Sequence, residues 1–231
     1  MSNTLPITVT PTYTLFLPLS IFHVPTAPVI EAINNPNGLG TYPVQWSQVN
    51  GATFYELQEA KAEDFAGASQ VYSGTLASHA VVGRGAARYS YRVRGGNQSW
   101  VTPWSSPQRT DVLWEAEPNN FYTQANGPLV SGLTYKGQFN PITDFDDYYV
   151  FVLAAAHTIE VWLTNIASGE NYDLILRNDA GQIPGGYSGL PGNSDEHVLL
   201  QSMPPGRYYA RVFNRSGTLS ATPYDLRVMY R

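Results

Sequence analysis

The chain has 231 residues, no cysteine, 13 basic and 18 acidic side chains, and a formal net charge of −5. The absence of cysteine excludes disulfides, zinc–thiolate sites and thiol catalysis, and the absence of a basic run argues against a nucleic-acid partner. No apolar stretch reaches the roughly 18 residues that a membrane-spanning helix needs. Charged and aromatic residues each make up 13% of the chain, with 20 glycines and 17 prolines. This composition is typical of strands and turns and predicts an all-β protein.

Residues 1–24 form an uncharged N-terminal arm in which apolar and polar side chains alternate. The apolar side chains at odd positions are Ile7, Val9, Tyr13, Leu15, Leu17, Leu19 and Ile21. Alternation with a period of two predicts a strand with one buried face. Pro11 and Pro18 remove backbone donors on opposite edges, so the arm cannot be a fully paired central strand. The arm also lacks the basic residues with which a secretory signal begins. We therefore expect that it is not cleaved as a signal and belongs to the mature protein.

The sequence leaves three roles open for the N-terminal arm. Inserted into the sheet of another copy, it would be a donor strand that drives polymerisation. It could also pack as an edge strand of its own chain, or be a remnant of a linker or targeting segment rich in threonine and proline. We favour the first role, which predicts a homo-oligomer or polymer.

Residues 25–112 carry seven short strand signals separated by turn residues, the number expected for an immunoglobulin-like sandwich. The segments are APVIEA, TYPVQWSQV, TFYELQEA, SQVYSG, SHAVVG, RYSYRVRG and PQRTDVL. VQWSQVNGATFYELQEA and YSYRVRG resemble strands of fibronectin type III domains. The resemblance implies that Trp46 lies in the core, that Tyr91 and Val93 point inward, and that the Tyr89 hydroxyl caps a neighbouring loop.

The stretch SWVTPWSSP resembles the Trp-Ser motif that precedes the last strand of many fibronectin type III domains. In such domains, arginines of the preceding strand stack on tryptophans of this motif. The resemblance therefore implies a cation–π ladder in which Arg92 and Arg94 contact Trp100 or Trp104.

Residues 113–231 again show only strand and turn signals, with EAEPNN followed by TQANG, TDFDDYYVFVL and MPPGRYYARVF. This order resembles the pre-peptidase C-terminal domain, a small jelly-roll-like β-sandwich appended to secreted bacterial proteases and other surface proteins. The collagen-binding domains of bacterial collagenases are related to it. The chain is therefore expected to hold two tandem β-sandwiches behind its arm, in an extracellular or cell-surface setting.

Two acidic segments of this second half offer hard oxygen ligands of the kind that calcium prefers. In calcium-binding relatives the EPN segment and the later aspartates share the metal. The resemblance assigns that role to Glu115, Glu117, Asn119, Asn120, Asp144 and Asp147. Asp146 is an alternative to Asp147, because the local register is ambiguous. The competing interpretation is a solvated acidic turn without a metal, in which the asparagines bond the local backbone.

Tyr208 and Tyr209 lie in a strand signal, and collagen-binding relatives use strand tyrosines for their ligand. The two are therefore candidates for a ligand surface. Because neighbouring side chains in a strand point to opposite faces, only one of them can be exposed. One core tyrosine and one surface tyrosine without a ligand is the interpretation we favour.

Catalysis has little support in the sequence. None of the four histidines, His23, His79, His157 and His197, lies in a metal-binding motif, and no nucleophile elbow or phosphate loop is present. We therefore expect no enzyme activity and no cofactor other than calcium.

Two functions follow from these patterns. The first is a structural protein, the subunit of a surface filament or sheath that assembles through its N-terminal strand. The second is an accessory module of a secreted bacterial hydrolase that holds an extracellular protein or polysaccharide. We favour the first, because neither sandwich needs the arm to close.

Overall fold

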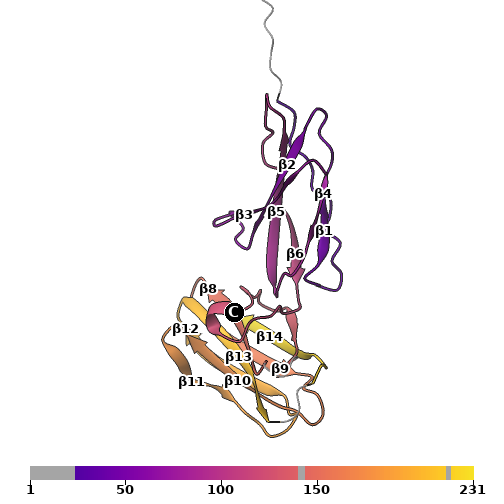
Figure 1. The fold of residues 1–231 in the computed structure, drawn as a ribbon. Helices are drawn as coiled ribbons and strands as arrows, with labels where there is room; N and C mark the ends of the chain where they lie inside the picture. The colour runs from indigo at the N-terminus through magenta and orange to yellow at the C-terminus, as the bar shows by residue number, and fades with distance from the viewer. Residues whose placement is uncertain (1–23, 140–143, 217–219) are drawn as a thin grey trace, which may run out of the picture.

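The computed structural model describes residues 24–139, 144–216 and 220–231, and all of its regular structure is β apart from one short 3₁₀ turn. Two antiparallel sandwiches follow one another along the chain, and Figure 1 shows them as separate bodies that meet at one end. The prediction of an all-β protein with two tandem sandwiches is confirmed. The arm residues named above, from Ile7 to Ile21, lie outside the described residues.

The first sandwich has a two-stranded sheet, β1-β4, and a four-stranded sheet, β3-β2-β5-β6. Its strands are β1 (Tyr42–Gln45), β2 (Phe54–Ala60), β3 (Ser69–Gly74), β4 (Ser78–Val81), β5 (Ala87–Gly96) and β6 (Gln108–Val112). Six of the seven expected strands form. The first expected strand, APVIEA, contributes a single bridge between Ile30 and Trp46, so the prediction of a full strand there is wrong.

The core of the first sandwich contains the residues that the sequence resemblance placed there. Trp46 is buried, and Tyr91 and Val93 on β5 are fully buried. The Tyr89 hydroxyl donates to the carbonyl of Gly85 at 3.0 Å, which confirms its expected capping role. The guanidinium groups of Arg92 and Arg94 lie 4.8 and 4.5 Å from the ring centre of Trp104, so the expected ladder forms on this tryptophan.

The second sandwich packs the sheet β11-β10-β13-β8 against the sheet β12-β9-β14-β7. Its strands are β7 (Thr134–Gly137), β8 (Asp146–Leu153), β9 (His157–Thr164), β10 (Asn171–Asn178), β11 (Gly181–Ser188), β12 (Glu196–Met203), β13 (Gly206–Ser216) and β14 (Tyr224–Tyr230). Alternate residues of each strand enter a shared core that is rich in tyrosine and aliphatic side chains. The 3₁₀ turn η1 (Tyr122–Gln124) precedes β7 and lies near β8.

The two sandwiches contact each other through small residues and one lysine side chain. The methyl group of Ala86, from the first sandwich, belongs to the core cluster of the second. Gly85 lies so close to Asn126 that an added Cβ would sit 1.8 Å from the Asn126 side-chain oxygen. The Lys61 ammonium donates to the carbonyl of Gly127 at 2.5 Å. These contacts hold the β4–β5 loop and the end of β2 against the second sandwich.

Candidate metal centre

The joining segment lies beside β7, and this pairing positions Glu115. The Lys136 amide donates to the carbonyl of Leu113 at 2.8 Å, and the Glu115 amide donates to the carbonyl of Lys136 at 3.0 Å. The Glu115 carboxylate therefore enters the end of the second sandwich. It accepts hydrogen bonds from the backbone amide of Gln138 and, at 2.6 Å, from the hydroxyl of Tyr149 on β8.

The turn that follows brings a second carboxylate to the same place. The Glu117 carboxylate accepts a hydrogen bond from the Asn119 amide at 2.9 Å. The side-chain nitrogen of Asn119 donates to Glu115 at 3.1 Å, and the backbone carbonyl of Asn119 accepts from the Tyr148 amide at 3.0 Å. Asn119 is fully buried and thus ties the turn to β8.

Asp147 on β8 supplies the third carboxylate. Its side chain is fully buried, and one of its oxygens accepts a hydrogen bond from the hydroxyl of Tyr224 on β14. Each of Glu115, Glu117 and Asp147 offers one oxygen, and these oxygens all lie within 4.8 Å of one another. Three carboxylates so close together are costly unless protons or a cation neutralise them.

We call Glu115, Glu117 and Asp147 the carboxylate cluster. The pKa values of its buried groups reflect the cost of placing these charges together. Burial and repulsion from Glu117 raise the pKa of Glu115 to about 8, although three hydrogen bonds oppose the rise. Burial, followed by repulsion from Glu115 and Asp144, holds the pKa of Asp147 well above its usual value. Burial, followed by repulsion from Glu115 and Asp147, also raises the pKa of the Tyr149 and Tyr224 phenols, so both stay protonated and donate.

The remaining candidate ligands lie at the edge of the carboxylate cluster. Asp144 is buried and close enough to raise the pKa of Asp147. When the side-chain nitrogen of Asn120 is oriented toward Asp144, it donates to the Asp144 carboxylate at 3.0 Å and to the backbone carbonyl of Asp146 at 3.1 Å. The Asp146 carboxylate instead forms an ion pair with Arg211. Of the two alternatives left open by the sequence, Asp147 is therefore the one that faces the cluster.

The residues present suit a calcium ion. Among the described residues, one buried oxygen of Asp147 and the side-chain oxygen of Asn119 have no hydrogen-bond partner. Buried oxygens without a partner are rare in folded proteins. Together with the three carboxylates they form a set of hard oxygen donors, which is the ligand chemistry of calcium.

Sequence reasoning missed the two tyrosines that frame the cluster. The Tyr149 and Tyr224 hydroxyls lie 2.9 Å apart and each donates to one carboxylate. Tyr224 is 77 residues from Asp147 along the chain, so local spacing carries no signal for it.

The two candidate ligand tyrosines are both buried, so the expectation that one of them is exposed is wrong. Tyr208 belongs to the core, and its hydroxyl donates to the carbonyl of Pro204 at 2.7 Å. Tyr209 is on the other face of its sheet, but the ring of Tyr122 on η1 covers it edge-on, with 5.8 Å between ring centres. A turn that is distant in sequence therefore shields a side chain that strand alternation places at the surface.

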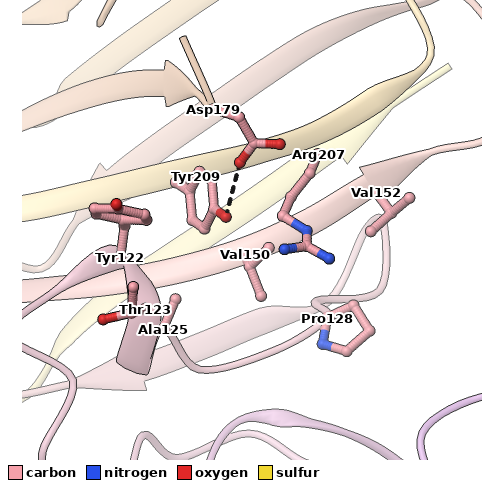
Figure 2. A pocket seen from close by; sticks show the side chains of 9 residues that line it. All are labelled: Tyr122, Thr123, Ala125, Pro128, Val150, Val152, Asp179, Arg207 and Tyr209. Carbon is pink, nitrogen blue, oxygen red and sulfur yellow. Dashed lines mark hydrogen bonds between the residues drawn. The ribbon is translucent and has the colours of Figure 1, made fainter. Parts of the chain in front are cut away.

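Tyr209 still lines a pocket of about 480 Å³ beside η1 (Figure 2). Its hydroxyl donates to Asp179 at 3.1 Å, with the exposed Arg207 side chain nearby. Val150, Val152 and Pro128 form the apolar part of the lining. We call this the η1 pocket.

Comparison with known proteins finds no matching family model. A collagenase, ColA of Clostridium perfringens, is 32% identical over 114 residues, which are 47% of this chain and 10% of the collagenase. The pre-peptidase C-terminal domain of a collagenase from Bacillus anthracis is similar in structure over 42% of this chain and 89% of its own, with 22% identity and a TM-score of 0.35. A fibronectin type III-like protein from Clostridium thermocellum covers 38% of this chain and 92% of its own, with 18% identity and a TM-score of 0.34.

Both families expected from the sequence are thus among the neighbours of this chain. The chain spans about a tenth of the curated collagenase that it matches. Among the described residues, no helix is long and apolar enough to cross a membrane.

Proposed function

We propose that this chain is a non-catalytic, calcium-binding accessory module of a secreted hydrolase that holds an extracellular protein. The observation that carries the proposal is the match to a collagenase, which covers a tenth of that enzyme and so indicates a module within it. Fold likeness by itself would support no function, because functions are carried by sites.

The carboxylate cluster supports the calcium part of the proposal. Glu115, Glu117 and Asp147 would hold the ion, with Asn119 and Asp144 beside them. The ion would neutralise the charges that now repel one another. Because Glu115 comes directly after the first sandwich and Asp147 lies on β8, the same ion would fix the joining segment to the second sandwich.

The η1 pocket supports the binding part of the proposal. It combines an apolar wall, Val150 and Val152, with the charged groups of Arg207 and Asp179. Mixed linings of this kind give a ligand both apolar contact and fixed polar partners. A peptide segment with apolar and charged side chains matches this lining.

Binding of the full chain to surfaces coated with collagen or gelatin tests the proposal. We expect saturable binding in 1 mM calcium, weaker binding in excess chelator, and loss of about tenfold in affinity for Arg207→Gln, which removes a charged partner from the pocket. Arg227→Gln, the same change on the opposite sheet, is the matched control and should bind normally. Equal binding by both variants and the unmodified chain would contradict the assignment of the η1 pocket.

The alternating arm favours a second candidate function, self-assembly into a surface filament or sheath. Its support is the regular apolar pattern between Ile7 and Ile21, which has no charged residue. Because this segment lies outside the described residues, assembly remains a prediction from the sequence.

A further inference from the structure

The outer face of the sheet β12-β9-β14-β7 carries a row of four side chains that none of the sites above uses. Strand pairing places His197 opposite Trp162, Trp162 opposite Arg227, and Arg227 opposite Thr134. The neighbours of Trp162 and Arg227 along their strands, such as Val161 and Leu226, are fully buried in the core. The row therefore faces away from the core on a sheet that the η1 pocket does not touch. We call it the Trp162 row.

The His197 ring covers one face of the Trp162 ring, and Trp162 also lines a pocket. The His197 ring stacks on the Trp162 ring with 4.9 Å between ring centres and 16° between planes. On the side of β14 and β7, Trp162 lines a pocket of about 360 Å³ with Thr134, Thr164, Asp225 and Arg227. This volume lies within the roughly 300–1,000 Å³ usual for small-ligand sites.

The charges of this pocket leave one guanidinium without a partner. The Asp225 carboxylate is paired with the Lys136 ammonium at 2.8 Å, so these two charges cancel. Arg227 is exposed, and no hydrogen bond or ion pair of its side chain occurs within the described part of the chain. The pocket thus carries one positive charge in a chain whose net charge is −5.

The chemistry of the pocket matches a sugar that carries a carboxylate. The apolar C–H face of a pyranose ring is weakly positive and stacks on the negative face of an indole. Two threonine hydroxyls can both donate to and accept from sugar hydroxyls. A guanidinium binds a carboxylate through two parallel hydrogen bonds.

A peptide strand fits this place poorly. Trp162 and Arg227 lie on β9 and β14, each of which is paired on both sides, so neither strand offers a free backbone edge here. We propose that the Trp162 row is a binding site for acidic polysaccharides, in which a uronate ring stacks on Trp162 and its carboxylate pairs with Arg227. This site is distinct from the η1 pocket and independent of the protein-binding function proposed above.

Affinity electrophoresis of the full chain through gels that contain polygalacturonate, hyaluronan or the neutral polymer dextran tests this inference. In 150 mM salt we expect retardation by at least one of the two uronate polymers and none by dextran. Arg227→Gln and Trp162→Thr should each weaken binding by about tenfold or more. Arg109→Gln removes the same charge from an exposed position on the first sandwich and should leave retardation unchanged.

Several outcomes would overturn the inference. No retardation by either uronate polymer removes the ligand class, and retardation that persists in both Arg227→Gln and Trp162→Thr removes the site. Equal loss in Arg109→Gln would mean that general charge attraction causes the binding. Because Arg227 is exposed, its variant is expected to fold, and an unchanged melting temperature confirms that any loss is local.

Discussion

The calcium-free protein should lose stability as the pH is raised from 5 to 8. The pKa of Glu115 is about 8 in the folded protein, against an ordinary value of 4.5 that applies to the unfolded chain. Between these values the folded protein keeps a proton that the unfolded chain releases. The proton bound to Glu115 therefore stabilises the folded protein fully below pH 4.5, and this stabilisation is lost as the pH rises through 8.

The size of the effect follows from the two pKa values. At about 1.4 kcal/mol per unit, the rise from pH 5 to pH 8 costs the metal-free protein about 3–4 kcal/mol through Glu115, less than three full units because Glu115 is only half ionised in the folded protein at pH 8. Asp147 acts in the same direction, because its pKa is also raised by burial. For a domain of this size, about 3 kcal/mol corresponds to a fall of roughly 10 °C in melting temperature.

Calcium should reverse this loss. Its ligands must be deprotonated, so its affinity grows with pH. At a hundred times its dissociation constant it contributes about 2.7 kcal/mol, which is close to the loss that Glu115 causes. We therefore expect that added calcium raises the melting temperature strongly at pH 8 and little at pH 5.

Thermal unfolding at pH 5 and pH 8, in chelator and in calcium, checks this prediction. Glu117→Gln removes an exposed ligand and should abolish most of the calcium-dependent rise, whereas Asp195→Asn, an exposed acidic residue outside the cluster, should not. A melting temperature in chelator that is the same at both pH values would refute the electrostatic reasoning. An absence of any calcium effect at pH 8 would refute the metal site.

Three further predictions concern the interface, the first sandwich and the arm. Gly85→Ala places a Cβ 1.8 Å from the Asn126 side-chain oxygen, so we expect a loss of about 1–3 kcal/mol in the free energy of unfolding. Proteolysis of the joining segment should also be faster. If neither quantity changes, the interface between the sandwiches can adjust to the added methyl group without cost. Trp104→Leu removes the ring that two arginines cover and should cost about 1–2 kcal/mol in denaturant unfolding, whereas Trp100→Leu, which lacks such contacts within the described residues, should cost less. Deletion of residues 1–24 should convert large assemblies into monomers in sedimentation experiments, and monomers from both forms would contradict assembly through the arm.

Much of the candidate metal centre was predictable because its first part is local. Glu115, Glu117 and Asn119 lie within five residues, and their hydrogen bonds join residues two and four positions apart. Short-range geometry of this kind is imposed by the turn itself. The choice between Asp146 and Asp147 was not predictable, because it depends on how β8 pairs with β13 and on the position of Arg211.

The sequence by itself determined the all-β class, most strand positions and the acidic turn, since alternation and turn residues act over a few neighbours. The tertiary structure decided which side chains meet across strands. It buried Tyr209 under η1, brought Tyr224 to Asp147, and aligned Trp162 with Arg227. The physical reason is that strand order and register join residues far apart in the chain, and no local pattern encodes those partners.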